Sequence, residues 1–228
     1  MFTGFSEATL QFFLDLRFHN ETSYFHANQE RYKQDVIAPF YALIETLAPT
    51  MQGIDPQMEI RPYRCLSRIH RDTRFSKDKS PYRDHLWFLF RRAAEPRDGS
   101  VFYWFGLAPG GMDWGVGVWR ANRLLMDQLR RQIAAKPKEA QAVLKACRLQ
   151  QNDFRLAGSV YQRLAVPDTV PPQLNMLYRA KELYIEKAHP DFELFDQPAL
   201  AEQLKQDYLS LAPMYHWLRG NYDQINTP

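Results

Sequence analysis

Apolar residues in the first fifty positions recur at the spacing that gathers side chains on one face of an α-helix. One such stripe follows Ser6, a residue type that caps helices, and a second follows Asn20. The two stripes consist of Leu10, Phe13, Leu14 and Phe18, and of Tyr32, Val36, Phe40, Leu43 and Leu47. Pro39 lies inside the second stripe and has no N–H to donate, so we expect it to kink or split that helix. The pattern therefore predicts that residues 6–47 are mainly helical.

Between residues 84 and 119 the pattern changes to short apolar and aromatic runs separated by turn residues, which is typical of consecutive antiparallel strands. These runs are Leu86–Phe90, Val101–Leu107 and Met112–Trp119. In the last run Gly115 and Gly117 alternate with valines, so one face of that strand carries no side chains and another backbone or a ligand can approach it closely. We also expect a fourth strand over Glu59–Ile69, where Pro62 indicates an edge or a bulge.

Helical spacing returns in the last part of the chain, after a stretch at residues 148–172 in which helix signals lapse. The apolar stripes are Leu125, Leu129 and Ile133; Leu174, Leu177, Tyr178 and Ile185; and Leu200, Leu204, Tyr208, Leu211 and Tyr215. We expect residues 174–218 to be mainly helical. Helices at both ends of a meander of strands predict an α+β fold, with a central antiparallel, curved or barrel-like sheet packed by N- and C-terminal helices. No linker or repeat interrupts the chain, which favours a single domain over residues 1–228.

Composition narrows the class of protein. The chain has 228 residues, of which 45% are hydrophobic and 24% charged, an ordinary globular balance that argues against a disordered or fibrous protein. No apolar run approaches the roughly 20 residues that a membrane helix needs, and the N-terminus lacks the pattern of a signal peptide. Cys65 and Cys147 form no CxxC pair, so we expect free thiols and a cytoplasmic protein without a membrane partner.

Charge is concentrated in one stretch of the chain. Residues 61–92 hold ten basic and three acidic residues, a net charge of +7, whereas the whole chain carries +3. A local excess of cations is the electrostatic signature of an anion-binding surface. The charge of this stretch therefore predicts an anionic binding partner.

The residues from Arg68 to Tyr82 match the pattern RxxRDxRFxxDKxxY at every fixed position. Those positions are Arg68, Arg71, Asp72, Arg74, Phe75, Asp78, Lys79 and Tyr82. With this motif the chain resembles a widespread, mostly bacterial family, the domain of unknown function 2461. The resemblance extends more loosely from the N-terminal helices to the final ones. It implies a shared fold and a shared motif, with no reaction attached.

The chemistry of the motif follows from its order of side chains. If residues 68–75 are extended, Ile69, Arg71 and Phe75 share a face, and the two apolar side chains draw Arg71 toward burial. A buried guanidinium needs a carboxylate partner, for which Asp72 and Asp78 are the candidates. Two carboxylates neutralise two cations and leave at least two more to bind a phosphate or a carboxylate.

Three roles for the motif stay open at this point: a structural latch that holds a loop onto the sheet, an anion-binding pocket, and general acid–base catalysis. We expect a cationic pocket that binds, with possible turnover, a phosphorylated or carboxylated small molecule. The alternative is a non-catalytic interaction or nucleic-acid-associated module that uses the same surface, with stacking by Phe75, Tyr82, Trp87 and Phe88. The expected ligand-binding residues are Arg68, Arg71, Asp72, Arg74, Asp78, Lys79 and Tyr82, joined by Trp119 as an aromatic wall and Lys181 as a further cation.

Motifs for other chemistry are incomplete or missing. The six histidines have no metal-ligand spacing, although His70 and His85 could converge with Asp72 and Asp84 across a hairpin. The glycines of Gly115–Gly117 give only part of a dinucleotide fingerprint and lie in a predicted hairpin strand. We therefore expect neither a metal nor a cofactor, and the sequence leaves the oligomeric state open.

Overall fold

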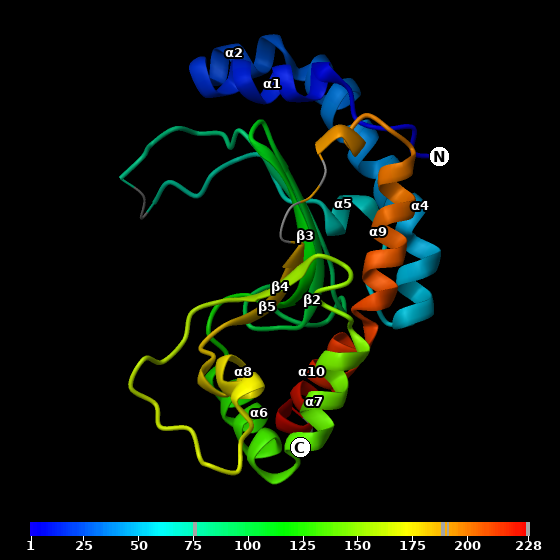
Figure 1. Ribbon diagram of the computed structural model, residues 1–228. Helices are drawn as coiled ribbons and strands as arrows, with labels where there is room; N and C mark the ends of the chain where they lie inside the picture. The colour runs from blue at the N-terminus through cyan, green and yellow to red at the C-terminus, as the bar shows by residue number, and fades with distance from the viewer. Residues whose placement is uncertain (75–76, 188–189, 191, 227–228) are drawn as a thin grey trace. The chain divides into compact units, whose positions relative to one another are not determined.

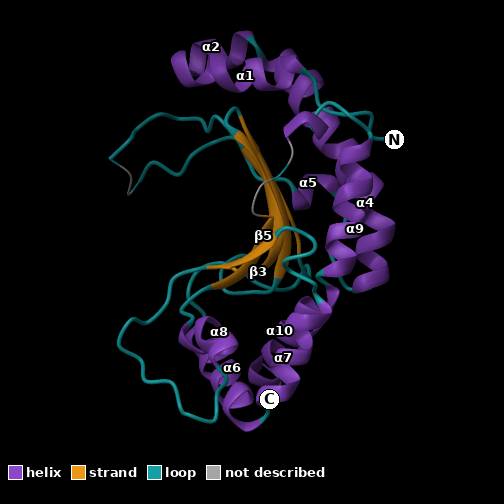
Figure 2. Ribbon diagram, in the orientation of Figure 1, coloured by secondary structure: helices purple, strands orange, loops and turns teal. Residues whose placement is uncertain are grey.

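The protein has an α+β fold whose centre is a five-stranded antiparallel sheet, open and curved, with flanking helices (Figures 1 and 2). The computed structural model describes residues 1–74, 77–187, 190 and 192–226. The strand order is β1-β2-β3-β5-β4. The expected fold class is thus confirmed, with a curved open sheet in place of a closed barrel. None of the helices in the described part of the chain has the length and apolar character needed to cross a bilayer.

The described residues divide into two compact units. Unit 1 comprises Met1–Phe90, Trp104–Trp114 and Pro190–Lys205, and unit 2 comprises Arg91–Tyr103, Gly115–His189 and Gln206–Pro228. Strands β2 (Phe102–Ala108) and β3 (Gly111–Val118) and helix α9 (Ala199–Ser210) contribute residues to both units. The single domain expected from the sequence stays a prediction.

Unit 1 contains most of the N-terminal helices and the first strand. Its other elements are α1 (Glu7–Phe18), α2 (Thr22–Ala27), α3 (Gln29–Arg31), the π-helical turn η1 (Tyr32–Ile37), α4 (Ala38–Ile54), α5 (Pro62–Cys65), β1 (Leu86–Phe90) and η3 (Phe192–Leu194). Its core is aromatic: the ring of Phe105 lies 5.4 Å from Phe88, 6.0 Å from Phe5 and 6.3 Å from Trp114, measured between centroids. Such offset pairs add to the stabilisation that burial alone provides.

Unit 2 combines the last two strands with a group of helices. Its other elements are α6 (Arg123–Ala135), α7 (Pro137–Ala146), β4 (Phe154–Ala157), η2 (Pro172–Leu174), α8 (Asn175–Arg179), β5 (Leu183–Lys187) and α10 (Ala212–Asn226). Helix α10 packs against α6 and α7, and α6 also contacts α8. Three buried tyrosines meet in the core, with the ring of Tyr103 lying 5.0 Å from Tyr208 and 5.2 Å from Tyr215.

Several predictions of secondary structure are confirmed. Residues 84–119 contain the consecutive strands β1, β2 and β3, and residues 6–47 are mainly helical. Pro39 divides the second helical region as expected, because the π-turn η1 ends at Ile37 and Pro39 lies in the first turn of α4. The missing N–H of Pro39 is tolerated there because the Asp35 carbonyl oxygen accepts a hydrogen bond from the Thr9 hydroxyl.

One prediction of secondary structure is wrong, and another holds only in part. Glu59–Ile69 is not a strand: Pro62 begins the short helix α5, and Leu66 forms only an isolated bridge with Phe88. Residues 174–218 are interrupted by strand β5, where Leu183 and Ile185 are buried and alternate with less buried residues in the two-residue period of a strand. Strand β4, in the stretch where helix signals lapse, was not predicted.

The glycine-bearing face of β3 receives another backbone. Gly117 pairs with Tyr184 of β5, and a Cβ atom at position 117 would lie 2.4 Å from the Tyr184 Cβ and 2.5 Å from the Leu183 carbonyl oxygen. The glycine pattern allowed a close approach by another backbone or by a ligand. At Gly117 it is the backbone of β5 that approaches.

Candidate functional site

The motif forms a hairpin, here called the basic hairpin (residues 68–84), that runs out from unit 1 just before β1 (Figure 1). His70 and Tyr82 form an antiparallel bridge at its base. Backbone hydrogen bonds from the Arg71 N–H to the Pro81 oxygen and from the Arg83 N–H to the Ile69 oxygen, both 2.8 Å, continue the pairing. The other described residues of the hairpin are loop (Figure 2), and Phe75, which we expected in the core, lies outside the described residues.

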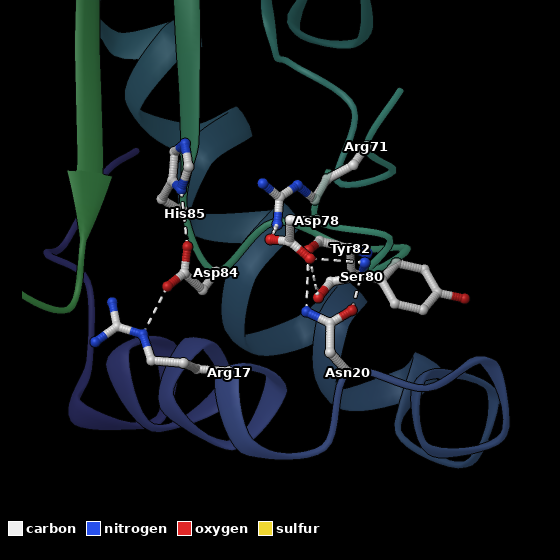
Figure 3. A network of polar contacts seen from close by, with 8 residues as sticks. All are labelled: Arg17, Asn20, Arg71, Asp78, Ser80, Tyr82, Asp84 and His85. Carbon is white, nitrogen blue, oxygen red and sulfur yellow. Dashed lines mark hydrogen bonds and ion pairs between the residues drawn. The ribbon is translucent and has the colours of Figure 1, made fainter. Parts of the chain in front are cut away.

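Buried side chains and one asparagine fix the base of the hairpin to the N-terminal helices. Ile69 and Tyr82 are buried, and the Tyr82 ring stacks on Phe25 at a centroid distance of 4.3 Å. The Asn20 side chain donates to the Tyr82 carbonyl at 3.0 Å and accepts from the Tyr82 N–H at 2.9 Å (Figure 3). Tyr82, expected among the ligand-binding residues, therefore anchors the hairpin.

Arg83 holds the base from the other strand. Its guanidinium donates to the Arg68 carbonyl oxygen at 2.7 Å and to the His70 carbonyl oxygen, and it lies over the Trp87 ring at 5.1 Å. Neither Arg83 nor Asn20 was among the expected site residues. Arg83 falls just past the motif, and Asn20 lies 62 residues before its partner in the sequence.

The Arg–Asp pairs of the motif lie within the hairpin. Arg71 forms an ion pair with Asp78, which also accepts from the Ser80 N–H at 2.9 Å and the Ser80 hydroxyl at 2.6 Å (Figure 3). The hydrogen bonds from Ser80 and the ion pair with Arg71 lower the pKa of Asp78 to about 2. The pairs therefore stiffen the hairpin and do not tie it to the sheet.

Asp72 was one of the two carboxylates left open as partners of a buried arginine, and it is not the one that pairs with Arg71. Asp72 binds the exposed Arg74 through two hydrogen bonds of 2.9 and 2.7 Å. Hydrogen bonding by Arg74 lowers the pKa of Asp72 to about 2. The more buried arginine is Arg71, whose side chain is 34% exposed and pairs with Asp78. This arrangement arises because Asp78, anchored by Ser80, lies across the hairpin from Arg71.

The hairpin retains cations after these pairs are made. It has six basic and three acidic residues, and one of the acids, Asp84, binds Arg17 on α1 at 2.6 Å. Lys79 donates to the Thr73 carbonyl oxygen at 2.9 Å, and among the described residues no carboxylate pairs with the exposed Arg68 or Lys77. Lys77 was not among the expected site residues.

These cations are spread along the hairpin. Arg68 lies at the base, whereas Arg74 is six residues further along, about 20 Å in an extended chain. A single phosphate contacts groups only a few ångströms apart. This spacing therefore favours successive contacts along the hairpin over one phosphate that is bound by several of its cations at once.

A second polar group lies where the hairpin meets β1. Asp84 accepts from Arg17 and contacts Nδ1 of His85 at 2.9 Å (Figure 3). The His85 ring stacks on Trp87 with the ring centroids 5.6 Å apart. Burial raises the pKa of Asp84, but the hydrogen bonds from His85 and Arg17 outweigh it and leave the pKa below its usual value. In the described part of the chain, no three or more His, Cys, Asp or Glu side chains form a group that could hold a metal ion.

Trp119 and Lys181, the two expected site residues outside the motif, belong to unit 2, whereas the basic hairpin belongs to unit 1. Trp119 is exposed and has the Arg120 guanidinium over its ring at 5.2 Å. The Lys181 ammonium lies over the Tyr161 ring at 4.9 Å. Their part in a ligand site stays a prediction.

The aromatic residues expected to stack on nucleic-acid bases are mostly used in packing. Tyr82 and Phe88 are buried, and Trp87 is covered in part by Arg83 and His85. Among its described residues, the site thus offers exposed positive charge with little free aromatic surface.

Comparison with known proteins gives one match. No curated protein and no solved structure matches the chain. A family model described as a conserved hypothetical protein, DUF2461, matches residues 8–217, which include the basic hairpin and nearly all of both units. The chain therefore belongs to the DUF2461 family.

Proposed function

We propose that the basic hairpin binds an extended phosphate-bearing polymer through its exposed cations, without carrying out chemistry on it. The observation that carries the proposal is the spacing of the cations along the hairpin, from Arg68 at the base to Lys77 near the tip. Both side chains are exposed, and hydrogen bonds from Arg83 and Asn20 fix the backbone at the base of the hairpin, where Arg68 lies. Preorganised charge lowers the ordering cost of binding.

The free energy of such binding would come mainly from phosphate contacts. Tyr82 and Phe88 are buried and so offer no stacking platform for bases. With two or three cations engaged (Arg68, Lys77 and Lys79), single-stranded nucleic acid should show a slope of about −2 when the logarithm of the association constant is plotted against that of the salt concentration. Binding should be weak and independent of base sequence.

A phosphorylated or carboxylated small molecule at the base of the hairpin is the second candidate. It is favoured by the rigid setting of Arg68, whose carbonyl oxygen accepts from Arg83. One or two cations suffice for a ligand with a single phosphate group, at about 1.5–3 kcal/mol for each charge-assisted hydrogen bond. The two candidate functions predict different dependences of affinity on the length of the ligand.

The test measures binding of fluorescein-labelled oligothymidylates of three and twelve nucleotides by anisotropy over a series of salt concentrations, with pyrophosphate as competitor. We expect the twelve-mer to bind more tightly than the three-mer. Arg68→Ala and Lys77→Ala should each flatten the salt slope by about 0.7. The control is Arg163→Ala, because Arg163 is exposed and belongs to unit 2 and not to the basic hairpin.

Equal affinity for both lengths, with saturable competition by pyrophosphate, would favour the small-molecule candidate. Equal effects of the hairpin variants and of Arg163→Ala would refute both, because the binding would then follow net charge alone.

We also propose that the protein acts in the cytoplasm. Cys65 and Cys147 are both buried thiols that form no disulfide, the state that a reducing compartment maintains.

A further inference from the structure

A pocket of about 330 Å³ lies in unit 1, where the first residues of the chain pass over the π-turn η1 and the start of α4. Its lining consists of Phe2, Thr3, Gly4, Ser6, Gln34, Asp35, Ala38, Pro39 and Ala42. The volume is at the lower end of the range for small-molecule sites. None of these residues belongs to the basic hairpin, so the pocket is independent of the function proposed above.

Pro39 and the wide turn of η1 give the pocket its floor. In a regular helix the N–H of residue 39 would bond to the Asp35 carbonyl oxygen, but proline has no N–H. The hydroxyl of the buried Thr9 donates to that oxygen instead, at 2.5 Å. The Ala38 N–H reaches back to the Lys33 carbonyl, five residues earlier, as a π-turn requires. Turns of this kind are frequent at functional sites.

The opposite wall of the pocket is fixed as well. The Phe2 N–H donates to the Thr46 hydroxyl at 3.1 Å, and the Phe5 N–H donates to the Phe195 carbonyl at 2.8 Å. Gly4 has a φ of +114°, and a Cβ there would lie 2.1 Å from the Asp196 carbonyl oxygen. The chain can follow this path only with glycine, so the wall is preformed.

The polar groups of the lining define what the pocket can bind. Asp35 is its one charged residue and is half-buried, and within the described residues its carboxylate has no hydrogen-bond or ion-pair partner. The Gln34 amide is engaged with Glu30 at 2.8 Å. Phe2, Pro39 and Ala42 supply apolar surface in the same lining.

We infer that this pocket binds a small organic cation, an ammonium group on a short alkyl chain, with Asp35 as the counter-ion. A partly desolvated carboxylate gains more from a cation than from a neutral donor, and the alkyl chain covers the apolar wall. An anion is disfavoured because the lining contains no basic side chain to balance Asp35.

The test is a titration of the ¹⁵N-labelled protein with n-butylammonium chloride, followed by amide chemical shifts. n-Butanol serves as the neutral analogue, and sodium chloride keeps the ionic strength constant. We expect saturable shifts at Thr3, Ser6 and Asp35, with an affinity at least tenfold higher for the ammonium than for the alcohol. Asp35→Asn should reduce the affinity for the ammonium to that for the alcohol.

Two further variants keep the test decisive. Asp168→Asn, at an exposed position of unit 2, should bind like the unmodified protein. Ala38→Leu fills the pocket without changing its charge and should abolish the shifts for both compounds. Equal affinities for ammonium and alcohol, or unchanged ammonium binding by Asp35→Asn or Ala38→Leu, would overturn the inference.

Discussion

Asn20→Ala should release the base of the basic hairpin. The side chain makes two hydrogen bonds to the backbone of Tyr82, at 2.9 and 3.0 Å in a partly buried position. At roughly 0.5–1.5 kcal/mol for each, the loss is about 1–3 kcal/mol. Because the Tyr82 N–H is itself one of the donors, its hydrogen exchange reports the change directly. A loss of this size corresponds to exchange about five- to 150-fold faster if local opening controls it.

The assay is amide hydrogen exchange followed by NMR, with Asp72→Ala as the matched variant in the same hairpin. Within the described residues the ion pair of Asp72 is with the exposed Arg74, and exposed ion pairs contribute little to stability. Protection at Tyr82 should therefore be unchanged in Asp72→Ala. The reasoning fails if Tyr82 exchanges equally fast in the unmodified protein and in Asn20→Ala, or if Asp72→Ala has an equal effect.

Two more predictions concern packing and acid stability. Gly117→Ala would place a Cβ 2.4 Å from that of Tyr184, so β3 and β5 would have to move apart. We expect about 1–3 kcal/mol of destabilisation, measured by urea unfolding. An unchanged unfolding midpoint would contradict the close approach of the two strands. The folded-state pKa of Asp78 is lowered from 3.8 to about 2, so the stabilisation it provides is present above pH 3.8 and is lost as the pH falls through about 2. The ¹³C chemical shift of the Asp78 carboxyl group should show this titration, and Ser80→Ala should raise the pKa of Asp78. An ordinary pKa of Asp78 in the unmodified protein would refute the assignment of Ser80 and Arg71 as its partners.

Local signals in the sequence predicted the elements that depend on local interactions. Strand β1 and the hairpin of β2 and β3 combine apolar runs with turn residues close in the chain, and all three were predicted. Strand β5 was missed because its alternation, Leu183 and Ile185, is too short to outweigh the helical stripe beginning at Leu174. Its two partners are β3, which lies far outside any sequence window, and β4, which was not predicted either.

The sequence indicated which charged residues belong to the candidate site, but it did not indicate which of them form ion pairs with one another. The motif brought Arg71, Asp72 and Asp78 to attention, but the choice between the two carboxylates depends on which side chain crosses the hairpin. Ser80 decides it by holding Asp78 in place. The contact of Asn20 with Tyr82 joins residues 62 positions apart, and nothing in either local sequence indicates it.

The pairing of β3 with β5 also bears on how the chain is made. Gly117 meets Tyr184, which is synthesised 67 residues later. At typical translation rates of about 5–20 residues per second, that edge of β3 waits roughly 3–13 seconds for its partner. During that interval its backbone N–H and C=O groups form an unprotected strand edge, the feature most prone to joining the wrong chain. Protection of a nascent chain that ends between these strands would therefore determine the yield of correctly folded protein, well before the finished molecule meets a ligand.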